Sequence, residues 1–184
     1  MKIGVVGIRL SKENTGIGNY TINLINKLAE ISNVKIYLFT TLDINELSNI
    51  NLKINMISIN DKYKSRYFKP IAEQIIILKY IKKYSIDLLF CPFYISPLLT
   101  KTKTVVTVHD MIYKEKNDGK NILKDTYRNI FFSLSILKAE KIITVSDFTK
   151  QEILRYFPSK KKYICYPLRY YSVSEGNSNQ TSKY

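Results

Sequence analysis

Short apolar runs alternate in this chain with longer segments whose apolar residues recur every three or four positions, and this alternation restricts the fold more than any other feature. The apolar runs predict strands at residues 2–8, 34–39, 53–59, 87–90, 103–108 and 141–145. The periodic segments predict helices from residue 16 and at 70–84, 121–139 and 146–157. Strands that alternate with helices of about ten residues or more form βαβ units. We therefore predict an α/β fold, a Rossmann-like and mostly parallel sheet with helices on both faces.

The first predicted helix follows the first strand after a loop of seven residues, 9–15. A single apolar stripe is expected along it, because its apolar residues fall three or four positions apart. The stripe consists of Ile17, Tyr20, Leu24, Leu28 and Ile31.

The chain has 184 residues, of which 45% are hydrophobic, so one domain of ordinary size is expected. A net charge of +14 favours an anionic partner such as phosphate, an acidic membrane surface or nucleic acid. The two densest basic runs, at 80–84 and 159–163, also fit ordinary solvated faces. Since no nucleic-acid motif and no basic run interleaved with aromatic residues is present, nucleic acid is not the expected partner.

Cys91 and Cys165 are too few for a disulfide framework, and no Cys/His set has zinc spacing, so a reducing compartment and no metal are expected. No apolar run approaches the roughly 20 residues of a membrane span. The expected location is the cytoplasm, with peripheral association at the inner face of the membrane as a further option. Residues 172–184 are small and polar and predict a disordered tail. The predicted folded domain is 1–166, and 167–184 would be a linker remnant or tail.

Gly16 and Gly18 stand directly before the first helical stripe. In an open parallel sheet the first strand-to-helix loop is a usual site for phosphate, and glycines let the backbone and the first helical amides approach an anion. The spacing fits neither the dinucleotide fingerprint nor a P-loop. A flexible loop before a helix explains the same glycines, and both interpretations stay open.

His109, the only histidine, directly follows the predicted strand 103–108, at the end of the strand where this sheet type places site residues. It could donate a hydrogen bond to a sugar hydroxyl or accept one. Residues 90–98, with Pro92 and Phe93, predict a rigid apolar wall for a sugar face or a lipid, or else a simple connecting loop. Ser146 is expected to cap a helix. Glu73, the one acid in the run 72–74, is expected to be solvated.

Taken in order, five stretches resemble the amino-terminal domain of retaining glycosyltransferases of family 4, which have the GT-B fold of two Rossmann-like domains. They are GIGNYTINLINKL, AEQ, DLLFCPFYISPL, VVTVHDMIY and KIITVSDFTKQEIL, and they cover most of residues 1–157. The resemblance implies a single amino-terminal half of a GT-B fold. It also implies transfer of a sugar from a nucleotide-diphosphate sugar to a glycan or lipid-linked acceptor, with no metal and no cofactor.

The resemblance also implies roles for individual residues. The loop of Gly16 and Gly18 would face the interdomain cleft near the donor phosphates, and His109 would contact the transferring sugar or the acceptor, with Asp110 at the same edge. The candidate catalytic residues are thus His109 and Asp110. The candidate substrate-binding residues are Gly16, Ile17, Gly18, Tyr20, Pro92, Phe93 and Ser146.

Enzymes of this family carry a second domain that binds the nucleotide, and this sequence stops near the point where a linker to it would begin. We therefore expect the acceptor-binding half of a transferase, inactive alone. A truncated gene, a single expressed domain and one half of a two-chain enzyme all fit, and truncation is favoured. The alternative is a non-enzymatic Rossmann-like binding module, or a subunit paired with a partner chain.

Overall fold

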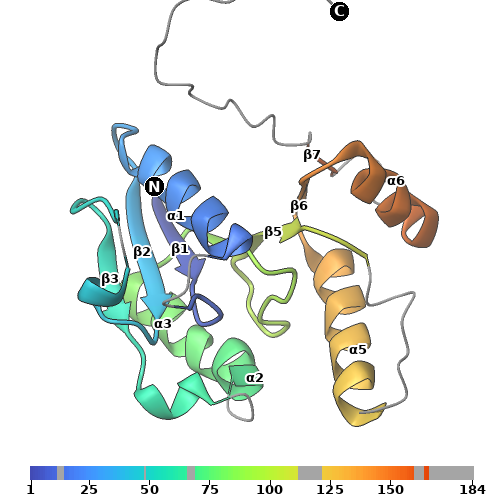
Figure 1. Ribbon diagram of the computed structural model, residues 1–184, viewed down its shortest axis with the longest axis horizontal. Coiled ribbons are helices and arrows are strands. Elements are labelled where there is room, and N and C mark those ends of the chain that lie inside the picture. Colours follow the sequence, from blue (N-terminus) through green and yellow to red (C-terminus); the bar gives the residue numbers. More distant parts are fainter. Residues whose placement is uncertain (12–14, 48, 66–68, 112–121, 160–163, 166–184) are drawn as a thin grey trace, which may run out of the picture.

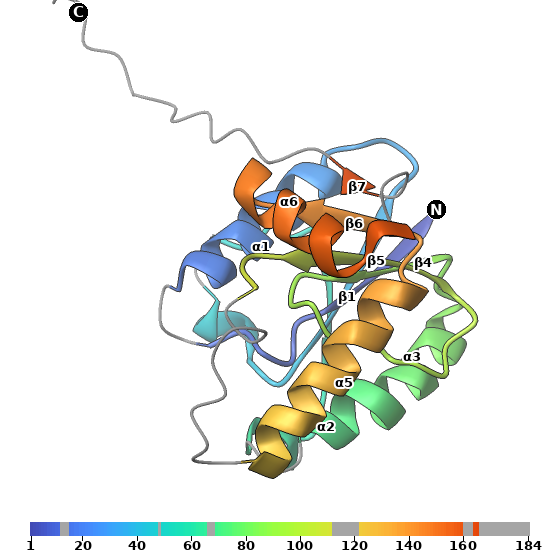
Figure 2. The same ribbon diagram turned by 90° about the vertical axis from the view of Figure 1, so that its right-hand side faces the viewer.

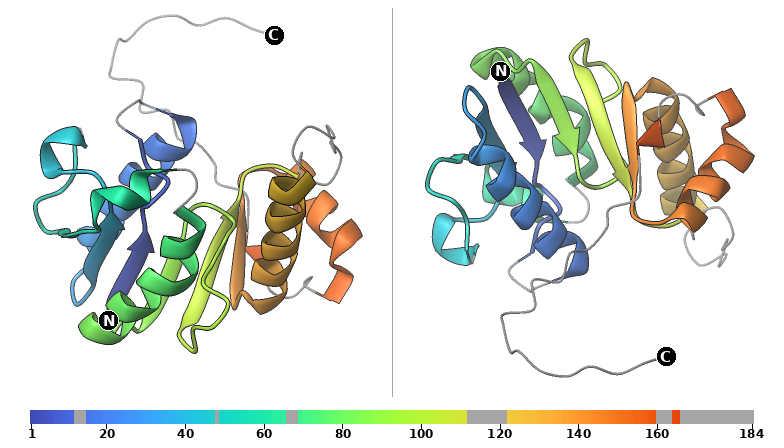
Figure 3. Two further views of the ribbon diagram at one scale, coloured as in Figure 1. Left: turned by 90° about the horizontal axis from the view of Figure 1, so that it is seen from below. Right: turned by 90° about the horizontal axis from the view of Figure 1, so that it is seen from above.

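The computed structural model describes residues 1–11, 15–47, 49–65, 69–111, 122–159 and 164–165. Its strands form one parallel sheet in the order β3-β2-β1-β4-β5-β6-β7. The strands are β1 Lys2–Val6, β2 Lys35–Thr40, β3 Asn55–Ser58, β4 Leu88–Cys91, β5 Lys103–Val108, β6 Lys141–Thr144 and β7 Ile164–Cys165. Figure 3 shows them side by side, from blue β2 and dark-blue β1 to green β4 and orange β6. The Rossmann-like prediction is confirmed.

Helices connect most of these strands (Figure 1). They are α1 Gly16–Ala29, α2 Lys69–Ile71, α3 Ile77–Tyr84, α5 Ile122–Lys138 and α6 Asp147–Tyr156, with a π-helical turn at Ala72–Ile76 and 3₁₀ turns at Ile44–Glu46 and Asp61–Lys64. The predicted helix 70–84 is thus divided by a π turn that the sequence pattern does not reveal. The two-residue strand β7 was also not predicted.

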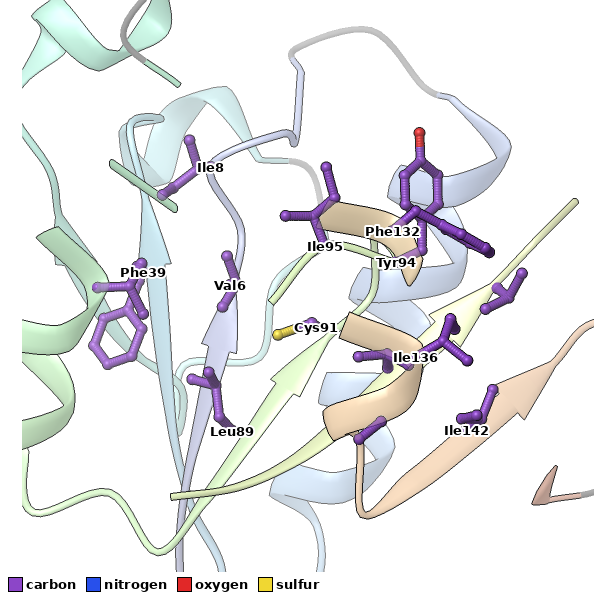
Figure 4. Close-up of a cluster of buried hydrophobic side chains, with 14 of the residues drawn as sticks. Val6, Ile8, Phe39, Leu89, Cys91, Tyr94, Ile95, Phe132, Ile136 and Ile142 are labelled. Carbon is purple, nitrogen blue, oxygen red and sulfur yellow. The ribbon is translucent and has the colours of Figure 1, made fainter. Parts of the chain in front are cut away.

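The sheet has a hydrophobic core on each face, and α1 lies on the opposite side from α2, α3 and α5 (Figure 2). The α1 side buries alternate strand residues such as Val5, Leu38 and Phe90. The other side buries the residues between them, such as Val6, Leu89 and Val106. Figure 4 shows this second core, where strand side chains gather against Phe132 and Ile136 of α5. Strands covered on both faces explain why the sequence shows continuous apolar runs rather than alternation.

The predicted stripe on the first helix was partly wrong. The fully buried residues of α1 are Tyr20, Thr21, Ile22, Ile25 and Ala29. Leu24 and Leu28 are only partly buried, and Ile31 lies beyond the helix and is 53% exposed. Thr21 can be buried because its hydroxyl donates to the Ile17 carbonyl at 2.7 Å, so a residue that looks polar in the sequence contributes to the core face.

Among the described residues, no helix is both long and apolar enough to cross a bilayer. The predicted tail and the boundary between 1–166 and 167–184 lie outside the described residues and stay predictions. The first strand ends at Val6, two residues before its predicted end, although Ile8 is still fully buried.

Candidate functional site

The strand order reverses between β1 and β4, because β2 and β3 lie on one side of β1 while β4 and the later strands lie on the other. In open parallel sheets, ligands bind outside the carboxyl ends of the strands at such a reversal. The residues that follow these strand ends therefore define the candidate site. Pro92 follows β4, His109 follows β5, and Ser146 comes two residues after the end of β6.

His109 is half-buried and held from three directions. Its Nε2 lies 3.0 Å from the Pro92 carbonyl oxygen, and its ring meets the Tyr20 ring edge-on, with centroids 5.2 Å apart. Its own carbonyl accepts from the Thr149 hydroxyl at 3.3 Å. The β4 loop and α1 therefore fix the imidazole, and α6 holds the backbone of the same residue.

The Pro92 carbonyl determines which ring nitrogen of His109 carries the proton. A carbonyl can only accept, so Nε2 is the donor and carries hydrogen. Burial lowers the pKa of His109, and the Pro92 bond and the charge of Asp110 oppose this only in part, so the neutral ring is favoured. Among the described residues Nδ1 has no hydrogen-bond partner. The neutral imidazole therefore presents a lone pair on Nδ1, which can accept a hydrogen bond from a hydroxyl.

Tyr20 and Ser146 support the histidine. The Tyr20 hydroxyl shares a buried 3.0 Å hydrogen bond with the hydroxyl of Thr107, which fixes the ring that His109 meets. Ser146 caps α6, accepting from the Thr149 amide at 3.1 Å and pairing with its hydroxyl at 3.0 Å. The predicted cap is confirmed, and through Thr149 it reaches the backbone of His109.

The amino terminus of α1 carries the two glycines of the sequence analysis. Thr15 caps the helix by accepting from the Gly18 amide at 3.0 Å, and no carboxylate stands in the first turn. A Cβ on Gly16 would meet nothing within 4 Å, whereas one on Gly18 would lie 3.0 Å from the Thr15 hydroxyl. The helix cap therefore explains why residue 18 is a glycine. At Gly16 the missing side chain leaves open space at the start of the helix.

The segment after β4 is less exposed than the predicted apolar wall. Pro92 is buried, and Phe93 is half-buried against the α1-side core. Tyr94 and Ile95 belong to the other core, where the Tyr94 ring meets Phe132 edge-on at 5.3 Å. The segment is thus rigid, as predicted, but most of its apolar surface stabilises the fold, and the Pro92 carbonyl is the group it presents to His109.

An ion pair that the sequence pattern does not predict lies beside this edge. Arg9, in the loop after β1, donates from Nε and Nη2 to the two carboxylate oxygens of Glu73, the second bond being 2.8 Å long. The Glu73 side chain is 2% exposed, so the expectation that it is solvated was wrong. A buried carboxylate needs a partner, and the partner lies 64 residues away, where no local pattern points to it.

Gln74, the next residue of the π turn, holds the segment after β4. Its amide nitrogen donates to the Ser96 carbonyl at 3.0 Å, and its oxygen accepts from the Leu98 amide at 3.0 Å. Ser96 is also tied to α5 by its amide, which donates to the Ser135 hydroxyl at 2.9 Å. Two adjacent residues of one π turn therefore anchor the loops after β1 and β4, the two strands at the reversal, and π turns frequently occur at functional sites.

Solved structures share this architecture. A lipopolysaccharide outer core galactosyltransferase, WaaB, in its apo form matches with a TM-score of 0.58 and 16% identity, over 90% of this chain and 45% of that one. A glycosyltransferase from Rickettsia africae ESF-5 matches with a TM-score of 0.54 and 20% identity, over 89% of this chain and 41% of that one. The fold is thus that of one Rossmann-like half of a GT-B glycosyltransferase, and the chain spans less than half the length of these proteins.

The family assignment is independent of these structures. The model of Glycosyltransferase Family 4 matches residues 14–166, which is most of the chain. The chain therefore belongs to glycosyltransferase family 4. No curated protein matches it significantly.

Proposed function

We propose that the chain is the acceptor-side half of a retaining glycosyltransferase that moves a sugar from a nucleotide-diphosphate sugar to a glycan or lipid-linked acceptor. The observation that carries this proposal is His109, held neutral at the end of β5 with Nδ1 open. A sugar presents hydroxyl groups that can donate to such a nitrogen. Holding the reacting sugar in one orientation lowers the entropic part of the barrier.

The start of α1 would receive the donor phosphates. Backbone amides at a helix amino terminus and the positive end of the helix dipole favour an anion, and no acidic residue in the first turn of α1 opposes it. The open space at Gly16 gives a phosphate access to this backbone. Ile17 belongs to the same first turn, and Asp110 directly follows His109 in the chain.

Turnover would need groups that a second domain or a partner chain supplies. Charge that develops on a leaving diphosphate has to be stabilised by well-placed donors, and losing one such donor costs on the order of a hundredfold in rate. The chain covers 45% and 41% of the two structures, so we propose that the nucleotide pocket lies outside it and that the chain alone is inactive. The excess of 29 basic over 15 acidic residues supports an acceptor at an anionic membrane surface on the cytoplasmic side.

A transfer assay with nucleotide sugars tests this function. The chain alone should be inactive, and the chain extended by the reading frame downstream should transfer a sugar. Activity of the chain alone would contradict the need for a second domain. Failure of the extended chain with all common nucleotide sugars would favour the binding-module alternative.

Two substitutions of His109 separate its two nitrogens in the extended chain. Gln places an amide nitrogen where Nε2 lies and keeps the bond to Pro92, but it loses the Nδ1 acceptor; Asn keeps an acceptor near Nδ1 and loses the bond. We expect His109→Gln to lower turnover by about a hundredfold and His109→Asn to lower it less. Equal losses would indicate that His109 acts through the fold and not through Nδ1.

A further inference from the structure

The two partners of the Arg9–Glu73 pair differ in how far their side chains are exposed. Glu73 is 2% exposed, whereas 28% of the Arg9 side chain remains exposed. The carboxylate is therefore enclosed, whereas part of the Arg9 side chain reaches the surface. Arg9 lies in the loop directly after β1, one of the two strands at which the strand order reverses, and Figure 1 shows this dark-blue loop extending toward α2.

Two N–H groups of Arg9 take no part in the bonds to Glu73. The bonds to Glu73 use Nε and Nη2, and within the described part of the chain no hydrogen bond uses Nη1, which carries two N–H groups. Because Glu73 holds the guanidinium by two parallel bonds, its plane is fixed and Nη1 points in one direction. A fixed donor pair on a partly exposed side chain, at the ligand edge of the sheet, is suited to recognise an oxygen-bearing ligand.

Charge decides which oxygen ligand fits. The Glu73 carboxylate cancels the charge of Arg9, so the pair as a whole does not attract an anion. The pKa of the nearby Tyr127 hydroxyl is raised to about 12, first by burial and then by Glu73, whose effect there exceeds the opposite effect of Arg9. Burial and then Glu73 also raise the pKa of the Cys91 thiol. Because the guanidinium is already paired with a carboxylate, a phosphate gains little net attraction here, whereas a neutral hydroxyl needs none.

We propose that Arg9 binds hydroxyl groups of the acceptor sugar through Nη1 and that Glu73 is the positioning residue that orients it. This subsite rests on the proposed transferase function and adds to it a residue and a ligand class. It lies on the α2 and α5 side of the sheet, whereas the Tyr20–His109 contact lies on the α1 side. The two sites would bind different parts of the sugar donor and the acceptor.

Titration of the 184-residue chain with methyl glycosides, followed by NMR, tests the subsite directly. The probes are methyl glycosides of glucose, galactose, mannose and N-acetylglucosamine, with inorganic phosphate as the competing ligand class. The Nε–H signal of Arg9 should shift as at least one glycoside is added. Absence of any shift with all four glycosides, or a larger response to phosphate than to every glycoside, would overturn the proposal.

Matched substitutions separate binding from folding. Arg9→Lys keeps a cation against Glu73 but removes the Nη1 donors, so glycoside affinity should fall about tenfold. Arg155→Lys is the control, since Arg155, whose side chain is 73% exposed, pairs with Glu152 on α6 at 3.8 Å. An Arg9→Lys variant that binds glycosides as tightly as the Arg155→Lys variant would overturn the proposal.

Glu73→Gln tests the charge argument. The amide keeps the shape of the side chain and exposes the positive charge of Arg9, so phosphate affinity should rise while glycoside affinity falls severalfold. Unchanged affinities for both ligands would contradict the positioning role. The nucleotide-sugar transfer assay judges the proposed function separately, because it depends on His109 and the donor side and not on free glycoside binding.

Discussion

The two sides of the sheet edge differ in how each holds its polar group. On the α1 side, His109 is fixed by neutral contacts: a carbonyl, an aromatic edge and a hydroxyl. On the α2 and α5 side, Arg9 is fixed by a buried carboxylate. The first arrangement costs little if a contact is lost, because each group is neutral. The second leaves an enclosed carboxylate without a partner if Arg9 is removed, so the fold depends on it far more strongly.

The largest effect is therefore expected on the charged side. Arg9→Leu leaves the Glu73 carboxylate enclosed without a partner and should lower the free energy of unfolding by about 3 kcal/mol, measured by urea denaturation. Replacing both residues with leucine should recover most of the loss. A single and a double variant of equal stability would show that the enclosed charge is not the cause.

Tyr20→Phe gives the next largest effect and acts on the neutral side. It removes the partner of the Thr107 hydroxyl, which is fully buried, and should cost about 1–2 kcal/mol in the free energy of unfolding. Tyr80→Phe is the control, because the Tyr80 hydroxyl makes an exposed 3.5 Å contact with the Ser58 carbonyl. If the two variants lose equal stability, the buried hydroxyl pair contributes nothing particular.

Ser146→Ala should cost about 1 kcal/mol in the free energy of unfolding, since it removes the cap of α6. Ser146→Asn supplies another capping oxygen and should restore most of the stability in thermal or urea unfolding. Failure of asparagine to restore stability would assign the effect to the shared bond with the Thr149 hydroxyl and not to the cap.

The smallest effect concerns pH. The folded protein holds His109 with a pKa below its ordinary value of 6.5, so the unfolded chain binds the proton more readily in that range. The stability contributed by neutral His109 is therefore full above 6.5 and declines as the pH falls below it. His109→Gln should flatten this part of the pH dependence of the unfolding free energy. An identical pH dependence in the variant would show that His109 is not responsible.

These comparisons also separate what was visible in the sequence from what was not. His109 could be selected because it directly follows a continuous apolar run, and chain order alone places such a residue at the ligand edge. Ser146 could be assigned as a cap from the residues that follow it. Glu73 was misjudged because its isolated position on a mostly apolar segment is typical of a solvated acid.

The sequence by itself determined the parallel Rossmann-like sheet, because strand and helix periods are local and their alternation permits few topologies. The resemblance to the family came from its five motifs. It did not determine which nitrogen of His109 can accept a hydrogen bond, which residues of the first helix are buried, or that Arg9 pairs with Glu73. Those features depend on contacts between segments tens of residues apart, such as Pro92 with His109 and Arg9 with Glu73. Only the tertiary structure brings these groups within hydrogen-bond distance, and only burial there makes their charge and protonation matter.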